Sequence, residues 1–186
     1  MILHPHIKYR SDIDGLRALA VLSVILFHIN AKWIPGGFLG VDIFFVISGY
    51  LITLILTKEV AATGKINIVN FYKRRIKRII PALLFVLIPT FIAGFLFFAP
   101  DDLLSLSKSM VWSFFSAANI YFFSSIDTGY FATGSSELPL LHLWSLGVEE
   151  QFYILWPFIV LYLLRYISSV KKQLMLVGIL FVISHL

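Results

Sequence analysis

Long runs of apolar residues, separated by short polar segments, make up most of this 186-residue chain. An α-helix needs about 20 apolar residues to cross the hydrocarbon core of a bilayer, which is about 30 Å thick. Several runs reach or approach that length, so the pattern predicts an all-α, polytopic transmembrane bundle with about five or six hydrophobic segments. We place these segments at residues 15–30, 38–57, 80–99, 109–123, 143–164 and 174–186.

The composition agrees with a membrane protein, because 59% of the residues are hydrophobic and only 13% are charged. The formal net charge of +5 does not indicate nucleic-acid binding, since the basic residues lie in short segments beside apolar runs. In such places they set topology or contact anionic lipid headgroups. The chain has no cysteine and therefore no disulfide or cysteine metal site, and we expect no bound metal.

The basic residues predict the orientation of the first three spans. The segment 58–79 holds seven of them, and cytoplasmic loops carry the excess of Lys and Arg. We therefore place this segment and the N-terminus in the cytoplasm and residues 31–37 outside. The third span is expected to begin near Pro81, because proline is favoured in the first turn of a helix.

Two segments are harder to assign. Residues 109–123 are predicted to form one helix, either re-entrant or interfacial on the outer side, or a full span that would place Arg165 outside. The segment 174–186 is shorter than a span, so the chain is expected to end inside a helix.

The first apolar run carries three ionisable side chains, Asp14, Arg17 and His28. Eleven residues are three helical turns plus about 20°, so Arg17 and His28 share one helix face, with Asp14 nearby. One interpretation is an ordinary ion pair at a helix end and a hydrogen-bonded histidine. The other is a general base or proton relay, because ionisable residues inside a membrane usually face protein or water.

Asp42 lies near the outer end of the second predicted span and needs a partner, for which His28 is the natural candidate. Glycines in and near this span are expected to allow close helix packing. They are residues 36, 37, 40 and 49.

Two further polar groups suggest chemistry. The basic segment ends in Arg75-Ile76-Lys77-Arg78, which is either a topology signal and headgroup anchor or a site for a phosphorylated ligand. Glu149 and Glu150 lie near the start of the run 143–164. Either the positive N-terminal end of the helix stabilises both carboxylates, or one of the two is a buried acid.

Four strings resemble, in order, the integral-membrane acyltransferase-3 family, which includes O-antigen and peptidoglycan O-acetyltransferases. They are DIDGLRALAVLSVILFH, GGFLGVDIFFVISGYLI, FYKRRIKRIIPALL and PLLHLWSLGVEEQFYILWP. The resemblance covers about residues 12–157 and implies that 1–186 is part of a membrane acyltransferase domain.

The resemblance implies transfer of an acetyl group from cytoplasmic acetyl-CoA to an envelope polysaccharide, such as lipopolysaccharide O-antigen, at the bacterial inner membrane. His28 resembles the family's essential histidine, and Arg17 its partner. Arg75 and Arg78 match R-x-x-R, and Ser145, Glu149 and Glu150 match S-L-x-x-E-E-Q. We expect His28 to act as base or acyl relay, assisted by Asp14 or Asp42. We expect the donor to be oriented by Arg17, Arg75 and Arg78.

Members of this family have roughly ten spans, so this chain corresponds to about half of the family's bundle, and a second chain could complete it. Two other hypotheses stay open at this point. The intramembrane Asp, Arg and His residues also suit a transporter or a proton-conducting bundle. The chain could also be an inactive fragment of a disrupted acyltransferase gene.

Overall fold

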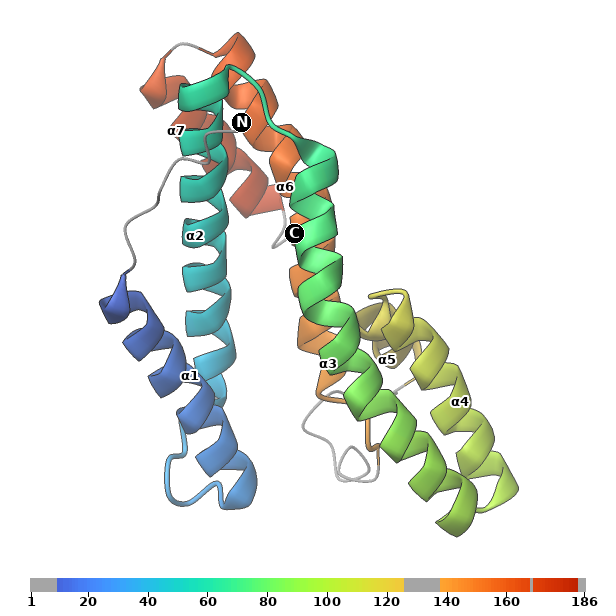
Figure 1. Ribbon diagram of the computed structural model, residues 1–186. Coiled ribbons are helices and arrows are strands. Elements are labelled where there is room, and N and C mark those ends of the chain that lie inside the picture. The colour runs from blue at the N-terminus through green and yellow to red at the C-terminus, as the bar shows by residue number, and fades with distance from the viewer. Residues whose placement is uncertain (1–9, 126–137, 168, 184–186) are drawn as a thin grey trace. The chain divides into compact units, whose positions relative to one another are not determined.

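The computed structural model describes residues 10–125, 138–167 and 169–183, which are almost entirely helical and contain no strand. This confirms the predicted all-α class. Figure 1 shows the elements in chain order. They are α1 (Ser11–Ile29), the short 3₁₀ turn η1 (Gly37–Leu39), α2 (Gly40–Thr63), α3 (Ile68–Phe97), α4 (Pro100–Phe114), α5 (Ala118–Ser125), α6 (Leu143–Tyr166) and α7 (Val170–Ile183).

Three helical stretches in the described residues are long and apolar enough to cross a membrane, namely Gly37–Thr63, Ile68–Phe97 and Leu143–Tyr166. The chain is a multi-pass membrane protein. Its residues form two compact units, which we describe separately. The first unit contains residues 1–66 and 156–186, and the second contains residues 67–155. The helix α6 contributes its first half to the second unit and its second half to the first.

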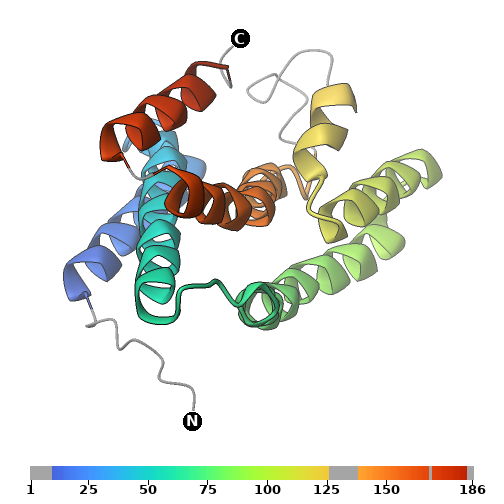
Figure 2. The same cartoon turned by 90° about the horizontal axis from the view of Figure 1, so that it is seen from above.

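In the first unit, α1 and α2 lie side by side, as Figures 1 and 2 both show. Two glycines of the predicted set make this approach possible. A Cβ on Gly37 would meet the backbone carbonyl of Ser23, and one on Gly40 would lie 2.5 Å from Ser23 Oγ. Small residues let helix backbones pack closely, so the prediction of glycine-mediated packing is confirmed at these two positions.

The second half of α6 and the helix α7 complete the first unit. The indole Nε1–H of Trp156 donates to Thr53 Oγ1 of α2 at 2.8 Å. The amide of Gln173 on α7 donates to the carbonyl oxygens of Ile167 at 2.7 Å and Leu163 at 3.3 Å. These bonds join α7 to the C-terminal end of α6, where the Leu163 carbonyl also accepts from the Ile167 backbone N–H at 3.1 Å. The predicted segment 174–186 corresponds to α7, although residues 184–186 lie outside the described part of the chain.

In the second unit, α3 begins at Ile68, well before the start predicted near Pro81. The side chain of Asn67 accepts a hydrogen bond from the Asn70 backbone at 3.0 Å and so caps the helix. Pro81 therefore lies inside α3, and most of the predicted hydrophilic loop 58–79 is helical. A helix can pass through a proline in a membrane protein because neighbouring groups satisfy the freed carbonyl.

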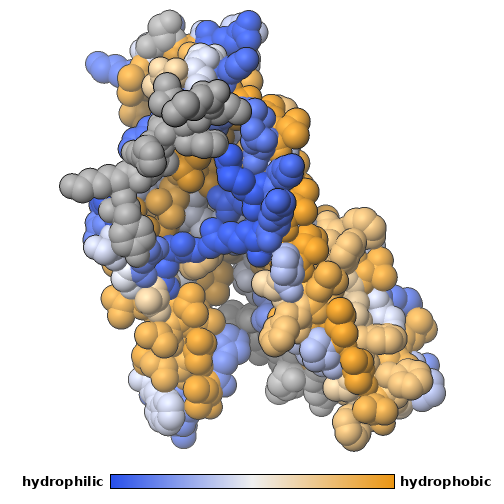
Figure 3. All heavy atoms as spheres, viewed as in Figure 1, coloured by the Kyte–Doolittle hydropathy of each residue, from blue (hydrophilic) through white to orange (hydrophobic). Residues whose placement is uncertain are grey.

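The early start of α3 gives this helix two different halves. Its basic residues lie in the first half and its long apolar run in the second. In Figure 3, hydrophilic side chains gather over the first part of α3, whereas mainly hydrophobic side chains cover its second part and α4.

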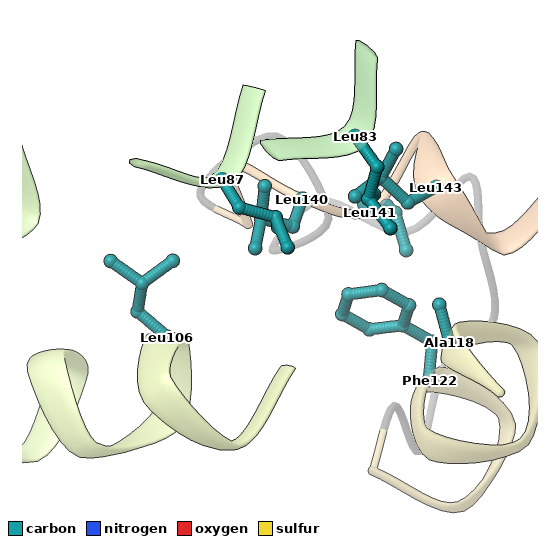
Figure 4. Close-up of a cluster of buried hydrophobic side chains, with 8 residues drawn as sticks. All are labelled: Leu83, Leu87, Leu106, Ala118, Phe122, Leu140, Leu141 and Leu143. Carbon is teal, nitrogen blue, oxygen red and sulfur yellow. The ribbon is translucent and has the colours of Figure 1, made fainter. Parts of the chain in front are cut away.

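A hydrophobic core holds the second unit together (Figure 4). It draws on α3, α4, α5, the segment before α6 and the first residue of α6. Its buried members are Leu83, Leu87, Leu106, Ala118, Phe122, Leu140, Leu141 and Leu143.

The single helix predicted for 109–123 is wrong, because the chain breaks between α4 and α5. Ser116 has a left-handed backbone with φ of 57°, a conformation that a serine adopts only when its surroundings hold it there. Because residues 109–123 form one apolar run, nothing in the sequence indicates this break. Residues on the facing helix α6 hold the break in place, as described below.

Candidate functional site

His28 lies on the last turn of α1 and is exposed. Its ring nitrogen Nδ1 is 2.8 Å from the carbonyl oxygen of Val24. A carbonyl only accepts hydrogen bonds, so Nδ1 carries the proton in the neutral ring and Nε2 is left as the basic nitrogen. An edge contact with Phe27, with ring centroids 5.7 Å apart, also holds the ring. The local geometry thus presents Nε2 as a hydrogen-bond acceptor.

Arg17 lies toward the start of α1 and is half-buried, with a guanidinium 3.8 Å from Asp14. Its guanidinium carbon is also 5.1 Å from the centre of the Phe44 ring on α2. Its Nε atom is buried and has no hydrogen-bond partner. The predicted i, i+3 ion pair therefore forms, and the buried Nε donor of Arg17 is left unpaired.

Asp42 lies in the first turn of α2 and is exposed. The positive end of the helix dipole accounts for a carboxylate at this position. Among the described residues, the structure contains no ion pair between Asp42 and His28. The partnership that the sequence suggested between these two side chains is therefore not formed.

Arg75 of α3 lies against α6. Its guanidinium carbon is 4.1 Å from the ring centre of Tyr153 and 5.7 Å from that of Phe71. A cation over an aromatic face is attracted by the ring quadrupole. Within the described chain, no hydrogen-bond acceptor or ion-pair partner contacts Arg75, so its N–H donors are available. Arg78 follows three residues later and is exposed.

Glu149 and Glu150 lie on α6 close to Arg75. Tyr153 donates a hydrogen bond from its hydroxyl to the Glu149 carboxylate. The Glu150 Oε1 atom is buried without a hydrogen-bond partner. The charged groups near the Glu150 side chain are Arg75 and Glu149. The structure thus brings Arg75 close to Glu149 and Glu150, which the sequence indicated as a separate group.

Several residues of the second unit were missed by the sequence analysis. Tyr72 donates to the carbonyl oxygen of Ile154 at 2.7 Å and so joins α3 to α6. Tyr153 lies within the string PLLHLWSLGVEEQFYILWP, but the sequence indicated no role in the site for it. Tyrosines four residues from a glutamate on a helix are common, so the sequence offered no distinctive signal.

Asn119 and Gln151 form a reciprocal pair of amide hydrogen bonds, at 2.9 and 3.2 Å, between α5 and α6. Gln151 also donates to the carbonyl oxygen of Ser116 at 3.1 Å. Gly147, one turn earlier on α6, allows this approach, because a Cβ there would lie 2.8 Å from Asn119 Oδ1. These contacts support the left-handed turn at Ser116.

A cavity of about 220 Å³ lies at the far end of the second unit, between the end of α3, α4, α5 and the segment before α6. Its lining is mostly apolar but includes Asp102 and Tyr121. The ring of Tyr121 is stacked with that of Trp112 at 6.2 Å. The cavity lies apart from the Arg75 group, along a helix of 30 residues.

The predicted site residues therefore fall into two groups. Asp14, Arg17, His28 and Asp42 lie in the first unit, where only Asp14 and Arg17 pair. Arg75, Arg78, Glu149 and Glu150 lie in the second unit, where all but Arg78 form one cluster with Tyr153.

The chain matches the family model described as "Acyltransferase domain" over residues 10–186. It therefore belongs to this family of membrane acyltransferases, which confirms the resemblance of its four sequence strings.

Two curated relatives show how the chain relates to longer proteins. The chain is 46% identical over 158 residues to the O-acetyltransferase OatA of Staphylococcus aureus (strain NCTC 8325), covering 85% of this chain and 26% of the relative. It is 43% identical over 170 residues to the peptidoglycan O-acetyltransferase OatA of Listeria monocytogenes, covering 91% of this chain and 27% of the relative. The chain thus spans about a quarter of the length of these relatives. No solved structure matches the chain.

Proposed function

We propose that this chain takes part in transferring an acetyl group from an acyl-CoA to a hydroxyl of a cell-envelope polysaccharide at the bacterial cytoplasmic membrane. The observation that supports this most strongly is the family match over residues 10–186. Because the chain spans about a quarter of its relatives, the activity proposed is that of the whole protein, with this chain carrying the motif-bearing part.

The acceptor that the relatives favour is peptidoglycan, because the printed name of the Listeria protein specifies it. The lipopolysaccharide O-antigen, which the sequence analysis named as an example, receives no support from these names. Both acceptors are sugar hydroxyls on the outer side of the membrane, so the chemistry required of the protein is the same.

For the donor, we propose that Arg75 and Arg78 bind the phosphates of the CoA moiety. Guanidinium groups bind phosphate through paired N–H donors. Arg75 supports this role because it is held over Tyr153, and its N–H groups contact no acceptor in the described residues. The basic first half of α3 would then face the cytoplasm, with the N-terminus on the same side, as the positive-inside rule predicts.

For the chemistry, we propose that Nε2 of His28 acts as the general base. The acceptor oxygen would form a bond to the acyl carbon while the carbon–sulfur bond breaks. The hydroxyl proton would pass through Nε2 to the departing thiolate. Asp14, Asp42, Glu149 and Glu150 are proposed as supporting charges, and Arg17 as a group that orients the donor.

The test is acetyl transfer from labelled acetyl-CoA to envelope glycan in membranes that contain this chain. The His28→Ala variant should lose at least about a hundredfold in rate, which is the usual contribution of a general base. The control is Ile29→Ala, a truncation of the neighbouring exposed side chain, and it should retain activity. Label that survives in His28→Ala would remove this residue from the mechanism. An absence of label in well-expressed wild type would refute the proposal for this chain by itself.

A further inference from the structure

We propose that Tyr153 is a positioning residue for the donor, because its ring face holds the Arg75 guanidinium in the orientation that receives the CoA phosphates. This inference rests on the proposed function. It adds a residue to the site that neither the motifs nor the relatives' names assign.

Arg75 lies against the ring of Tyr153. The guanidinium carbon of Arg75 lies 4.1 Å from the ring centre of Tyr153, whereas Phe71, on the same helix, is farther away at 5.7 Å. Tyr153 is only 3% exposed, so its ring is a fixed surface. An aromatic face binds a guanidinium without using its N–H donors. Arg75 is therefore held in place while its hydrogen-bonding groups stay available.

Tyr153 is itself held in place. Its hydroxyl donates to the carboxylate of Glu149, four residues earlier on α6. The next residue is joined to α3 through the Tyr72 hydroxyl, which lies 2.7 Å from the Ile154 carbonyl oxygen. Because the ring is also buried, packing alone keeps it beside Arg75, and the bond to Glu149 adds to this restraint.

Arg75 also keeps its hydrogen-bonding groups although an acidic side chain is nearby. Glu150 is close enough to interact electrostatically with Arg75, and its Oε1 atom is buried without a hydrogen-bond partner. Among the described residues, Arg75 lies over the Tyr153 ring and forms no salt bridge with Glu150. Its N–H donors can therefore bind an anionic ligand.

The experiment measures the binding of CoA and of pantetheine, which lacks the nucleotide phosphates, to the purified chain in lipid nanodiscs. The ratio of the two affinities measures the contribution of the phosphorylated nucleotide part of CoA. We expect Tyr153→Leu to reduce this ratio by about tenfold, which is the range of a desolvated cation–aromatic contact. Tyr153→Phe keeps the ring face and should leave the ratio within about twofold of wild type.

The matched control is Tyr162→Leu, which removes an exposed tyrosine from the same helix, where it contacts Tyr166 instead. It should leave the ratio unchanged. Adding Tyr153→Leu to Arg75→Ala should lower the ratio no further than Arg75→Ala does alone, because Tyr153 acts through Arg75.

The possible failures are distinguishable. If wild type prefers CoA over pantetheine and Tyr153→Leu does too, the positioning role is refuted while the donor proposal stands. If Tyr153→Leu weakens both ligands equally, Tyr153 is only a packing residue, and the inference is again wrong. If wild type binds neither ligand, or both equally, Arg75 is not a donor-phosphate site and the inference falls with it.

Discussion

Replacing Gln151 with alanine should loosen the junction at which α5 and the turn at Ser116 dock on α6. The substitution removes three hydrogen bonds, two that the Gln151 amide donates and one that it accepts from Asn119. A hydrogen bond between membrane helices contributes about 0.6 kcal/mol, and one in a soluble protein about 1 kcal/mol. We therefore expect the free energy of unfolding to fall by about 2–3 kcal/mol.

The measurement is unfolding by SDS in mixed micelles, followed by far-UV circular dichroism. The control is Leu155→Ala on the same helix, an exposed residue whose truncation should change the free energy of unfolding by less than about 0.5 kcal/mol. A double-mutant cycle with Asn119→Ala should give a coupling energy of about 1 kcal/mol, because two of the three bonds join this pair. A Gln151→Ala variant as stable as wild type would refute the reasoning, and so would a coupling energy near zero.

Two glycine-related predictions follow from backbone geometry. Gly40→Ala should destabilise the pairing of α1 with α2 by about 1–3 kcal/mol, because its Cβ would meet the Ala20 carbonyl; Gly36→Ala, whose Cβ would meet only Leu39 at 3.8 Å, is the control. Equal SDS resistance of the two variants would contradict the packing described here. Ser116→Gly should raise the free energy of unfolding by up to about 1 kcal/mol, because glycine adopts the left-handed conformation without the Cβ penalty. A loss of stability in the same SDS titration would show that the turn is not strained.

The sequence predicted the helical segments because each one depends on local composition. The runs at 15–30, 38–57 and 143–164 match α1, α2 and α6 to within a few residues at most ends. The start of α3 was wrong because the cap at Asn67 is a single side-chain bond, and a proline at Pro81 is an equally good local signal for a helix start. The break at Ser116 was missed because its support, Gln151, lies 35 residues away from Ser116 in the chain.

The candidate site was predicted in part. The charged residues attracted attention because ionisable groups are rare in apolar segments, and the resemblance assigned them roles. The structure adds the contacts between them, such as Tyr153 with Arg75 and with Glu149. It also shows that Asp42 and His28, which the sequence suggested as partners, do not pair among the described residues.

The sequence by itself determined that this protein is a helical membrane protein, because a chain that crosses lipid needs long apolar helices whatever their arrangement. It also determined which residues are charged. Its motifs were also enough to place it in its family. Only the tertiary structure decided which aromatic ring lies under Arg75 and which amide supports Ser116. Such contacts join residues far apart in the chain, and their geometry depends on how α3, α5 and α6 pack, which no local pattern encodes.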